Sequence, residues 1–190
     1  KNGFICVPCP VSCPLDEAPG KGRYVFSVGA GAFAVSKAKW LGLGGFDDLF
    51  APFYTEETDL AYRALKRGFK IIYEPRSLVY HVRSASFNKY FARETLNQII
   101  QRNHILFNVA DCGGWGFAAI FLLLLPFRIL RTLLHGKTES TRAMLSSLPY
   151  LPRALFLRFT RNRQRAHPSL SDSEIIRLSG VIRLLDKHAE

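Results

Sequence analysis

An almost unbroken apolar run in the middle of the chain constrains the fold more than any other feature. Its 13 residues, from Trp115 to Phe127, carry no charge, and Arg128 and Arg131 follow directly. A helix that spans a bilayer needs about 20 predominantly apolar residues. The run is short of that length and predicts an interfacial or re-entrant helix, although both spanning and lying on a membrane stay open for residues 115–134.

The charge of the chain is strongly and unevenly positive. The 190 residues include 26 Lys and Arg against 15 Asp and Glu, a formal net charge of +11 at pH 7. Only 10 basic and 8 acidic residues precede His81, whereas 16 basic and 7 acidic residues lie between His81 and the last residue. Such a balance indicates a polyanionic partner: a nucleic acid, a nucleotide phosphate or an anionic membrane surface.

Sequence motifs distinguish among these partners. The basic half shows no zinc-finger spacing, no basic region joined to heptads and no RNA-binding aromatic motif. Lipid explains the apolar run as well as the charge, whereas nucleic acid explains the charge alone. We therefore expect an anionic membrane surface as a partner, and no nucleic acid.

The cysteines indicate the compartment. Three of the four, Cys6, Cys9 and Cys13, lie in a proline-rich opening segment. Their spacing matches part of a ferredoxin motif whose first cysteine is missing here, so a loop with free thiols is the default interpretation. Four cysteines are too few for a disulfide framework, which favours a reducing compartment.

Apolar periodicity divides the chain at residue 86. Before it, the expected order is strand 24–28, strand 32–35, helix 37–41, helix 58–66, strand 69–73 and strand 78–82. After it, the period suits a long helix from residue 87 to about 111, and Ser171-Asp172-Ser173-Glu174 is a capping box that opens a last helix. We predict an α/β part over 1–86 and a helical, basic, membrane-peripheral segment over 87–190.

An acidic cluster, Glu56-Glu57-Thr58-Asp59, stands at the entry to the helix predicted over 58–66. Free backbone N–H groups and the helix dipole stabilise carboxylates there, so an ordinary solvated helix start explains the cluster without any function. The context offers an alternative, because the cluster follows a glycine-rich loop, Gly44-Gly45-Phe46-Asp47-Asp48, and precedes the strand that contains His81. One carboxylate there could accept the proton of a hydroxyl nucleophile. His81 is either a hydrogen-bonded strand residue or, beside carboxylates and a diphosphate, a ligand of a divalent metal.

Four motifs follow one another along the first half of the chain: Gly29-Ala30-Gly31-Ala32-Phe33-Ala34-Val35, then Gly44-Gly45-Phe46-Asp47, then Glu56-Glu57-Thr58-Asp59-Leu60 with Arg63 and Gly68, and last Tyr73-Glu74-Pro75 with His81. In this order and spacing they resemble the C-terminal part of family 2 glycosyltransferases, in the rhamnosyltransferase-like bacterial branch. The resemblance covers about residues 24–86. It implies an α/β fold, namely the C-terminal half of the GT-A (Rossmann-like nucleotide-diphospho-sugar transferase) fold followed by a mostly helical membrane-associated segment.

The resemblance also implies residue roles. Glu57 falls where the family usually has the second acid of a Glu-Asp pair, the catalytic base, and is one methylene longer than the usual Asp. Asp59 matches an acid that supports the helix, and His81 matches a metal ligand of some members. The implied acceptor-binding residues are Gly44, Gly45, Asp47 and Glu56.

The family's N-terminal half, with its nucleotide-binding βαβ units and Asp-x-Asp motif, has no counterpart in this chain. We therefore interpret the chain as a C-terminal fragment that is inactive alone. Its divalent metal, Mg²⁺ or Mn²⁺, would need ligands from the preceding half of the enzyme.

The activity expected of the complete enzyme is inverting transfer of a sugar from a nucleotide-sugar donor to a hydroxyl of a glycan or lipid-linked acceptor, in cell-surface polysaccharide synthesis. The expected location is the cytoplasmic face of the plasma (inner) membrane, as a peripheral or monotopic protein. The alternative is a non-catalytic basic membrane-binding module, in which the acids only start a helix.

Overall fold

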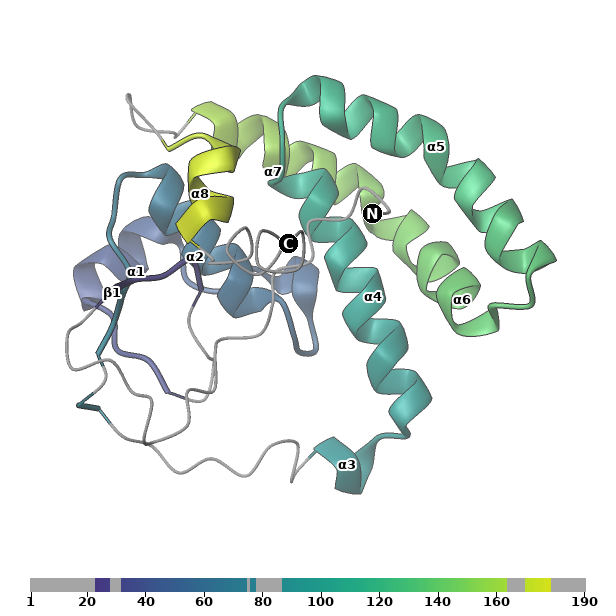
Figure 1. Cartoon of the computed structure of the whole chain (residues 1–190), viewed down its shortest axis with the longest axis horizontal. Coiled ribbons are helices and arrows are strands. Elements are labelled where there is room, and N and C mark those ends of the chain that lie inside the picture. The colour runs from purple at the N-terminus through teal and green to yellow at the C-terminus, as the bar shows by residue number, and fades with distance from the viewer. Residues whose placement is uncertain (1–22, 28–31, 75, 78–86, 164–169, 179–190) are drawn as a thin grey trace, which may run out of the picture. The chain divides into compact units, whose positions relative to one another are not determined.

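The computed structural model describes residues 23–27, 32–74, 76–77, 87–163 and 170–178, and most of these are helical (Figure 1). The two described strands, β1 (Arg23–Tyr24) and β2 (Ile72–Tyr73), form one antiparallel pair. The predicted helical segment is thus confirmed. The described residues form no Rossmann-like parallel sheet, so the finer GT-A prediction stays a prediction.

The chain divides into two compact units, each of which draws on separate stretches of sequence. The first, the helical unit, contains described residues 47–56 and 87–163. The second, the sheet unit, contains described residues 23–27, 32–46, 57–74, 76–77 and 170–178.

In the sheet unit, two helices form a small apolar core. Helix α1 (Lys37–Leu43) contributes Leu43, and helix α2 (Glu56–Lys66) contributes Leu60 and Ala64. Half-buried aromatic side chains complete this core: Trp40 of α1, and Phe33 and Phe69 from the segments that flank the two helices. The core is built from positions four residues apart on α2, which one helical face presents together.

Helix α8 (Asp172–Leu178) joins the same unit through its N-terminus. The capping box is formed as predicted, because the Ser171 N–H donates to the Glu174 carboxylate (2.7 Å) and the Glu174 N–H donates to Ser171 Oγ (3.2 Å). Lys66 of α2 forms an ion pair with Asp172 (2.7 Å) and donates to the carbonyl of Leu170 (2.8 Å). The capping box therefore starts a helix whose first residue is ion-paired to α2.

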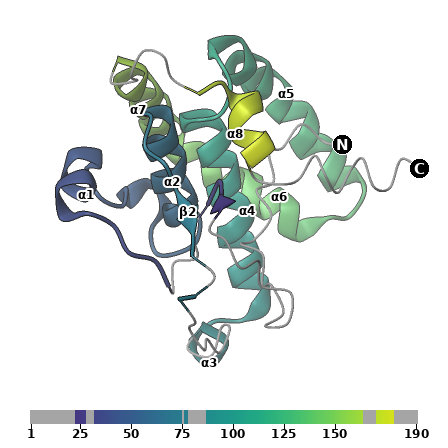
Figure 2. The same cartoon turned by 60° about the vertical axis from the view of Figure 1, so that its left-hand side comes forward.

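The helical unit is a group of helices arranged around α4, and Figure 2 shows it from a second direction. Helix α4 packs against α6 and α7, and α5 packs against α6. Buried residues on α4 include Leu106, Phe107 and Val109. The described elements are the 3₁₀ turn η1 (Asp48–Phe50), α3 (Phe87–Tyr90), α4 (Arg93–Ala110), α5 (Trp115–Leu134), α6 (Thr138–Ser147), the 3₁₀ turn η2 (Leu148–Tyr150) and α7 (Leu151–Arg163).

The strands predicted over 24–28 and 69–73 are shorter than expected, because only β1 and β2 of two residues each form there. Three further expectations about element bounds need correction. The run 32–35 is not a strand: its β-rich residues are mostly exposed and have no partner strand among the described residues. The long helix predicted from residue 87 is broken between α3 and α4, where the Phe91 ring packs edge-on against Phe53 at 5.0 Å between centroids.

The third correction concerns the apolar helix, which does not end at Phe127. Helix α5 continues through both arginines to Leu134, and the chain turns at Gly136 with a φ of 64°. Arg128 remains helical with its guanidinium 5.1 Å from the centre of the Phe121 ring, seven residues earlier. At 1.5 Å per residue, 20 residues reach about 30 Å. The length argument against a membrane span therefore fails, because α5 is long and apolar enough to cross a membrane by length and composition.

Candidate functional site

The turn that precedes α2 has an unusual backbone. Tyr54 and Thr55 have φ values of 68° and 81°, a region that residues with a Cβ atom rarely occupy. Thr55 is β-branched, which makes a positive φ still less favourable. Such conformations cost free energy and persist only where surrounding groups hold them, often beside functional residues. We call residues 51–55 the strained turn.

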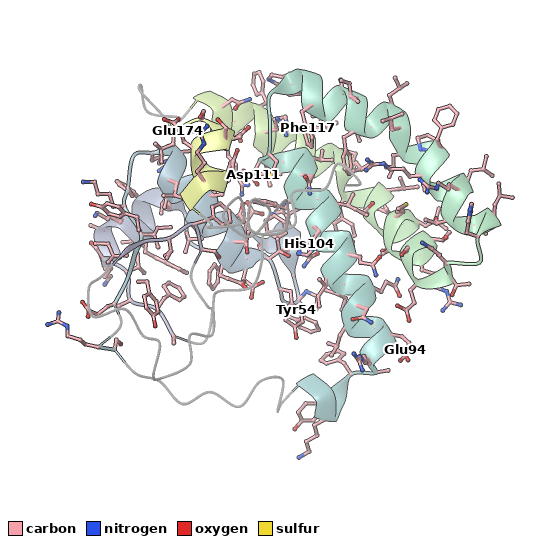
Figure 3. The ribbon with its side chains drawn as sticks, viewed as in Figure 1. Tyr54, Glu94, His104, Asp111, Phe117 and Glu174 are labelled. Atoms are coloured by element: carbon pink, nitrogen blue, oxygen red, sulfur yellow. The ribbon has the colours of Figure 1, made fainter. Side chains whose placement is uncertain are left out.

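Helix α4 of the same unit holds the strained turn in place through Asn103. This side chain is fully buried, and its Nδ2 donates to the carbonyls of Phe50 (2.8 Å), Phe53 (3.0 Å) and Tyr54 (2.8 Å). An amide carries two N–H groups, so three acceptors share two protons. Figure 3 labels Tyr54 on the turn and His104 on the helix beside it.

Arg102, the neighbour of Asn103 on α4, adds a second layer. Its guanidinium donates to the Asn103 side-chain oxygen at 3.0 Å and 2.8 Å, and also to the carbonyl of Ala51. The guanidinium lies 5.2 Å from the centre of the Tyr150 ring. The Asn103 oxygen is therefore bonded as well as its nitrogen, which fixes the orientation of the amide toward the turn.

Two polar atoms at the end of the turn are buried without a described hydrogen-bond partner. They are Thr55 Oγ1 and Glu57 Oε2. The part of the chain that the structure describes offers no donor or acceptor to either atom. Buried polar atoms are normally paired, and an exception calls for an explanation such as a catalytic role. These atoms belong to residues that flank the first residue of α2.

Burial raises the pKa of Glu57 above its usual range, while a hydrogen bond from its own backbone N–H opposes the shift. A raised pKa means that the carboxylate binds a proton more strongly than an exposed glutamate. Such a carboxylate is a better general base once it is ionised. Glu56, the preceding residue, is half-buried.

In the sheet unit, Asp59 and Arg63 connect α2 to the glycine-rich loop. Both are buried, with Arg63 Nε 2.9 Å and Arg63 Nη2 2.6 Å from Asp59 Oδ2. The guanidinium also donates to the carbonyls of Leu43 (2.5 Å) and Gly45 (2.7 Å). Asp59 thus orients the arginine that holds the loop.

The two glycines adopt conformations that favour glycine. Gly44 ends α1 with a φ of 81°, and Gly45 follows with a φ of 66°. A Cβ atom on Gly45 would lie 3.2 Å from the Trp40 indole, whereas one on Gly44 would meet nothing within 4 Å. Both glycines therefore shape the loop, and their role in acceptor binding stays a prediction.

Asp47, in the helical unit, is engaged by long-range ion pairs that the sequence analysis did not identify. Its carboxylate accepts from the Leu49 N–H (2.9 Å), Arg153 (3.2 Å) and Arg161 (2.9 Å). Arg161 also contacts Asp111 at 2.7 Å. No sequence signal could have found these pairs, because more than 100 residues separate Asp47 from its two arginines.

The structure assigns the predicted site residues to both units. Asp47 and Glu56 belong to the helical unit, whereas Gly44, Gly45 and Glu57 belong to the sheet unit. His81 lies outside the described residues. Within the described ranges, no group of three His, Cys, Asp or Glu side chains could hold a metal ion.

No protein-family model matches this chain, and neither the curated proteins nor the solved structures contain a match to it.

Proposed function

We propose that this chain is the acceptor-side part of an inverting glycosyltransferase of the GT-A type, with Glu57 as the catalytic base. The observation that carries the proposal is the carboxylate of the half-buried Glu57, whose Oε2 atom is buried without a hydrogen-bond partner among the described residues and whose pKa is raised by burial. The strained turn before it and the resemblance of the motif Glu56-Glu57-Thr58-Asp59 to family 2 glycosyltransferases support the same assignment.

The proposed reaction is a displacement at the anomeric carbon of a nucleotide sugar. Glu57 takes the proton of an acceptor hydroxyl on a glycan or lipid-linked substrate, and that oxygen attacks the anomeric carbon. The new C–O bond forms as the bond to the nucleotide diphosphate breaks, so the configuration inverts and the diphosphate leaves with the bonding electrons. The proton remains on Glu57 until water removes it.

Each further acid has a different assignment in this proposal. Glu56 lies at the start of α2 and binds the acceptor, whereas Asp59 is engaged with Arg63 and supports the loop. The described residues do not fit a divalent metal, because they bring no three suitable ligands together. The expectation of Mg²⁺ or Mn²⁺ with His81 as a ligand therefore rests on residues outside the described ranges, and no step is derived through the metal.

The test replaces one carboxylate at a time in the complete enzyme, assayed by nucleoside diphosphate release from a panel of nucleotide sugars. Glu57→Gln keeps the shape of the side chain and removes its basicity, so turnover should fall about 10²- to 10⁴-fold. Glu56→Gln is the matched control and should cost less. Near-wild-type turnover of the Glu57→Gln enzyme would overturn the assignment.

The alternative, a non-catalytic basic membrane-binding module, is favoured by one observation: the large exposed apolar residues of α5. In that case the complete protein would release no diphosphate from any donor. Membrane binding of α5 would be unaffected by either glutamine substitution.

A further inference from the structure

Helix α5 has two unlike faces. Ala118, Phe121 and Leu125 are buried and follow one another at helical spacing. The rest of the helix presents large apolar side chains to solvent, and Figure 3 shows many side chains projecting from it. We call the following set the apolar face of α5: Trp115, Ile120, Leu123, Leu124, Phe127, Leu130, Leu133 and Leu134, which are between 40% and 75% exposed.

Such a face needs a covering partner. A soluble monomer rarely exposes a contiguous apolar patch of this kind, and a larger one marks a protein or membrane interaction site. The apolar face extends from the first residue of α5 to its last, over about 30 Å. Its partner must therefore contact the helix along its whole length.

The helix packed on the other side of α5 limits the orientation that α5 can take in a bilayer. Helix α6 packs against α5, and the hydroxyl of Thr141 donates to the hydroxyl of Thr132 at 2.9 Å. Exposed charged residues of α6, Glu139 and Arg142, flank Thr141 beside the last turn of α5, so they would lie at the edge of the hydrocarbon if α5 crossed a bilayer with α6 attached. Charges that enter the hydrocarbon are costly. A helix that lies in the plane of the interface avoids this cost, because only its outer face enters the lipid.

The charges near the C-terminal end of α5 favour a membrane with anionic headgroups. Arg131, Lys137 and Arg142 are exposed, and Glu139 is the acid among them. Each cation held near an anionic surface strengthens membrane binding, roughly fivefold at low salt. A second copy of this chain would instead bring the same positive charges together, so charge complementarity favours an anionic bilayer.

We propose that α5 lies in the plane of an anionic membrane interface, with its apolar face among the acyl chains and Arg131, Lys137 and Arg142 at the phosphate groups. This inference is independent of the proposed glycosyl transfer, because it concerns another part of the chain and needs no catalytic activity.

The first test measures flotation of the 190-residue chain with vesicles of phosphatidylcholine alone or mixed with phosphatidylglycerol. We expect binding to the mixed vesicles that high salt weakens only in part, because screening removes the ionic contribution and leaves the apolar one. Complete release by salt would overturn the proposal. So would concentration-dependent dimerisation through α5 without vesicle binding.

Matched serine variants test which residues insert. Leu123, Leu130 and Leu133 are exposed on the apolar face, so their joint replacement by Ser should not disturb folding and should weaken vesicle binding about 100-fold or more. The control variant carries serine in place of Leu41, Ile72 and Tyr90, which lie outside α5 and are 65%, 60% and 72% exposed. This variant should bind vesicles like the wild type. Equal binding by both variants would overturn the proposal, with circular dichroism confirming that each is folded.

A depth measurement separates an in-plane helix from a spanning one. The probe is the fluorescence of a single tryptophan. In the Trp40→Phe variant, Trp115 reports the depth of the start of α5. Adding Trp115→Phe and Leu124→Trp to this variant moves the probe to the middle of the helix. Lipids brominated near the headgroup should quench both probes more than lipids brominated near the acyl methyl end. If the probe at 124 is quenched most by the deep bromines, α5 spans the bilayer and the in-plane proposal is wrong.

Discussion

The side-chain nitrogen of Asn103 lies 2.8 Å from the carbonyl oxygen of Tyr54, a residue whose φ is 68°. The same nitrogen bonds the carbonyls of Phe50 and Phe53. One buried amide on α4 therefore holds the turn that leads into α2, where the two adjacent glutamates lie. The interaction joins residues about 50 positions apart and compensates for a backbone conformation that the turn would not adopt alone.

Two substitutions of similar shape test this role of Asn103. Asn103→Leu removes the donors and leaves three carbonyls unbonded, which should lower the free energy of unfolding by about 2–4 kcal/mol. Asn103→Asp should cost at least as much, because a carboxylate turns negative oxygen toward carbonyl oxygens. Urea unfolding followed by circular dichroism measures both. A loss below about 0.5 kcal/mol in the leucine variant would show that the turn is held by other groups.

Local patterns predicted local structure well. The α8 capping box, the helix stop at Asp111 to Gly114 and the acids at the start of α2 all depend on neighbours within four residues, which the sequence displays directly. The apolar run ends at Phe127, just before Arg128, so it predicts a helix that is shorter than α5. The helix itself continues through the arginine, whose guanidinium lies against Phe121.

Long-range relationships could not be predicted in the same way. The motif indicated Glu57 as a candidate base, but its burial depends on tertiary packing that no spacing encodes. The interactions of Asn103 with the strained turn and of Asp47 with Arg161 join distant segments. Nothing in the local sequence around an Asn or an Asp distinguishes a side chain that is buried and bonded to a distant segment from one that is exposed to solvent.

Gly44 and Gly45 offer a matched pair for backbone effects. Alanine at either position must adopt a positive φ, which costs about 1 kcal/mol or more. At Gly45 the added Cβ would also lie 3.2 Å from the Trp40 indole. We expect Gly45→Ala to destabilise the chain more than Gly44→Ala in thermal unfolding. Equal losses would mean that Trp40 shifts without cost.

The raised pKa of Glu57 predicts a pH-dependent stability cost. The folded chain holds the Glu57 proton more strongly than the unfolded chain, whose carboxyl has its ordinary pKa of 4.5. Between the two pKa values the folded state binds more protons, so the free energy of unfolding falls as pH rises through this window. Glu57→Gln removes the cost and should unfold at higher urea than the wild type at pH 7. The difference should disappear below pH 4.5.

Glu94→Gln is the control for this pH dependence. Glu94 is exposed in the first turn of α4, where the positive end of the helix dipole stabilises a negative charge. Its replacement should leave stability at pH 7 unchanged or slightly lower. If Glu57→Gln is also destabilising at pH 7, the carboxylate makes a stabilising interaction in the folded chain and the proposed base is wrongly chosen.

Arg158 provides the last prediction, because its buried guanidinium caps the C-terminus of α4. It donates to the carbonyls of Val109 (2.5 Å), Gly113 (2.8 Å), Asn108 (3.0 Å) and Cys112 (2.5 Å). The final carbonyls of a helix have no intrahelical partner and carry the negative end of the dipole, so a cation fits there.

Arg158→Met keeps much of the apolar stem and leaves these buried carbonyls without their donor, which should cost about 3–5 kcal/mol in urea unfolding. Arg158→Lys keeps the charge but cannot reach four oxygens with a planar fork, so its loss should be intermediate. Arg153→Met is the control, because Arg153 is half-exposed and its ion pair with Asp47 is 3.2 Å long, so at most about 1 kcal/mol is expected. If Arg158→Met costs no more than this control, water replaces the guanidinium at the helix end, and the junction between α4 and α5 does not depend on Arg158.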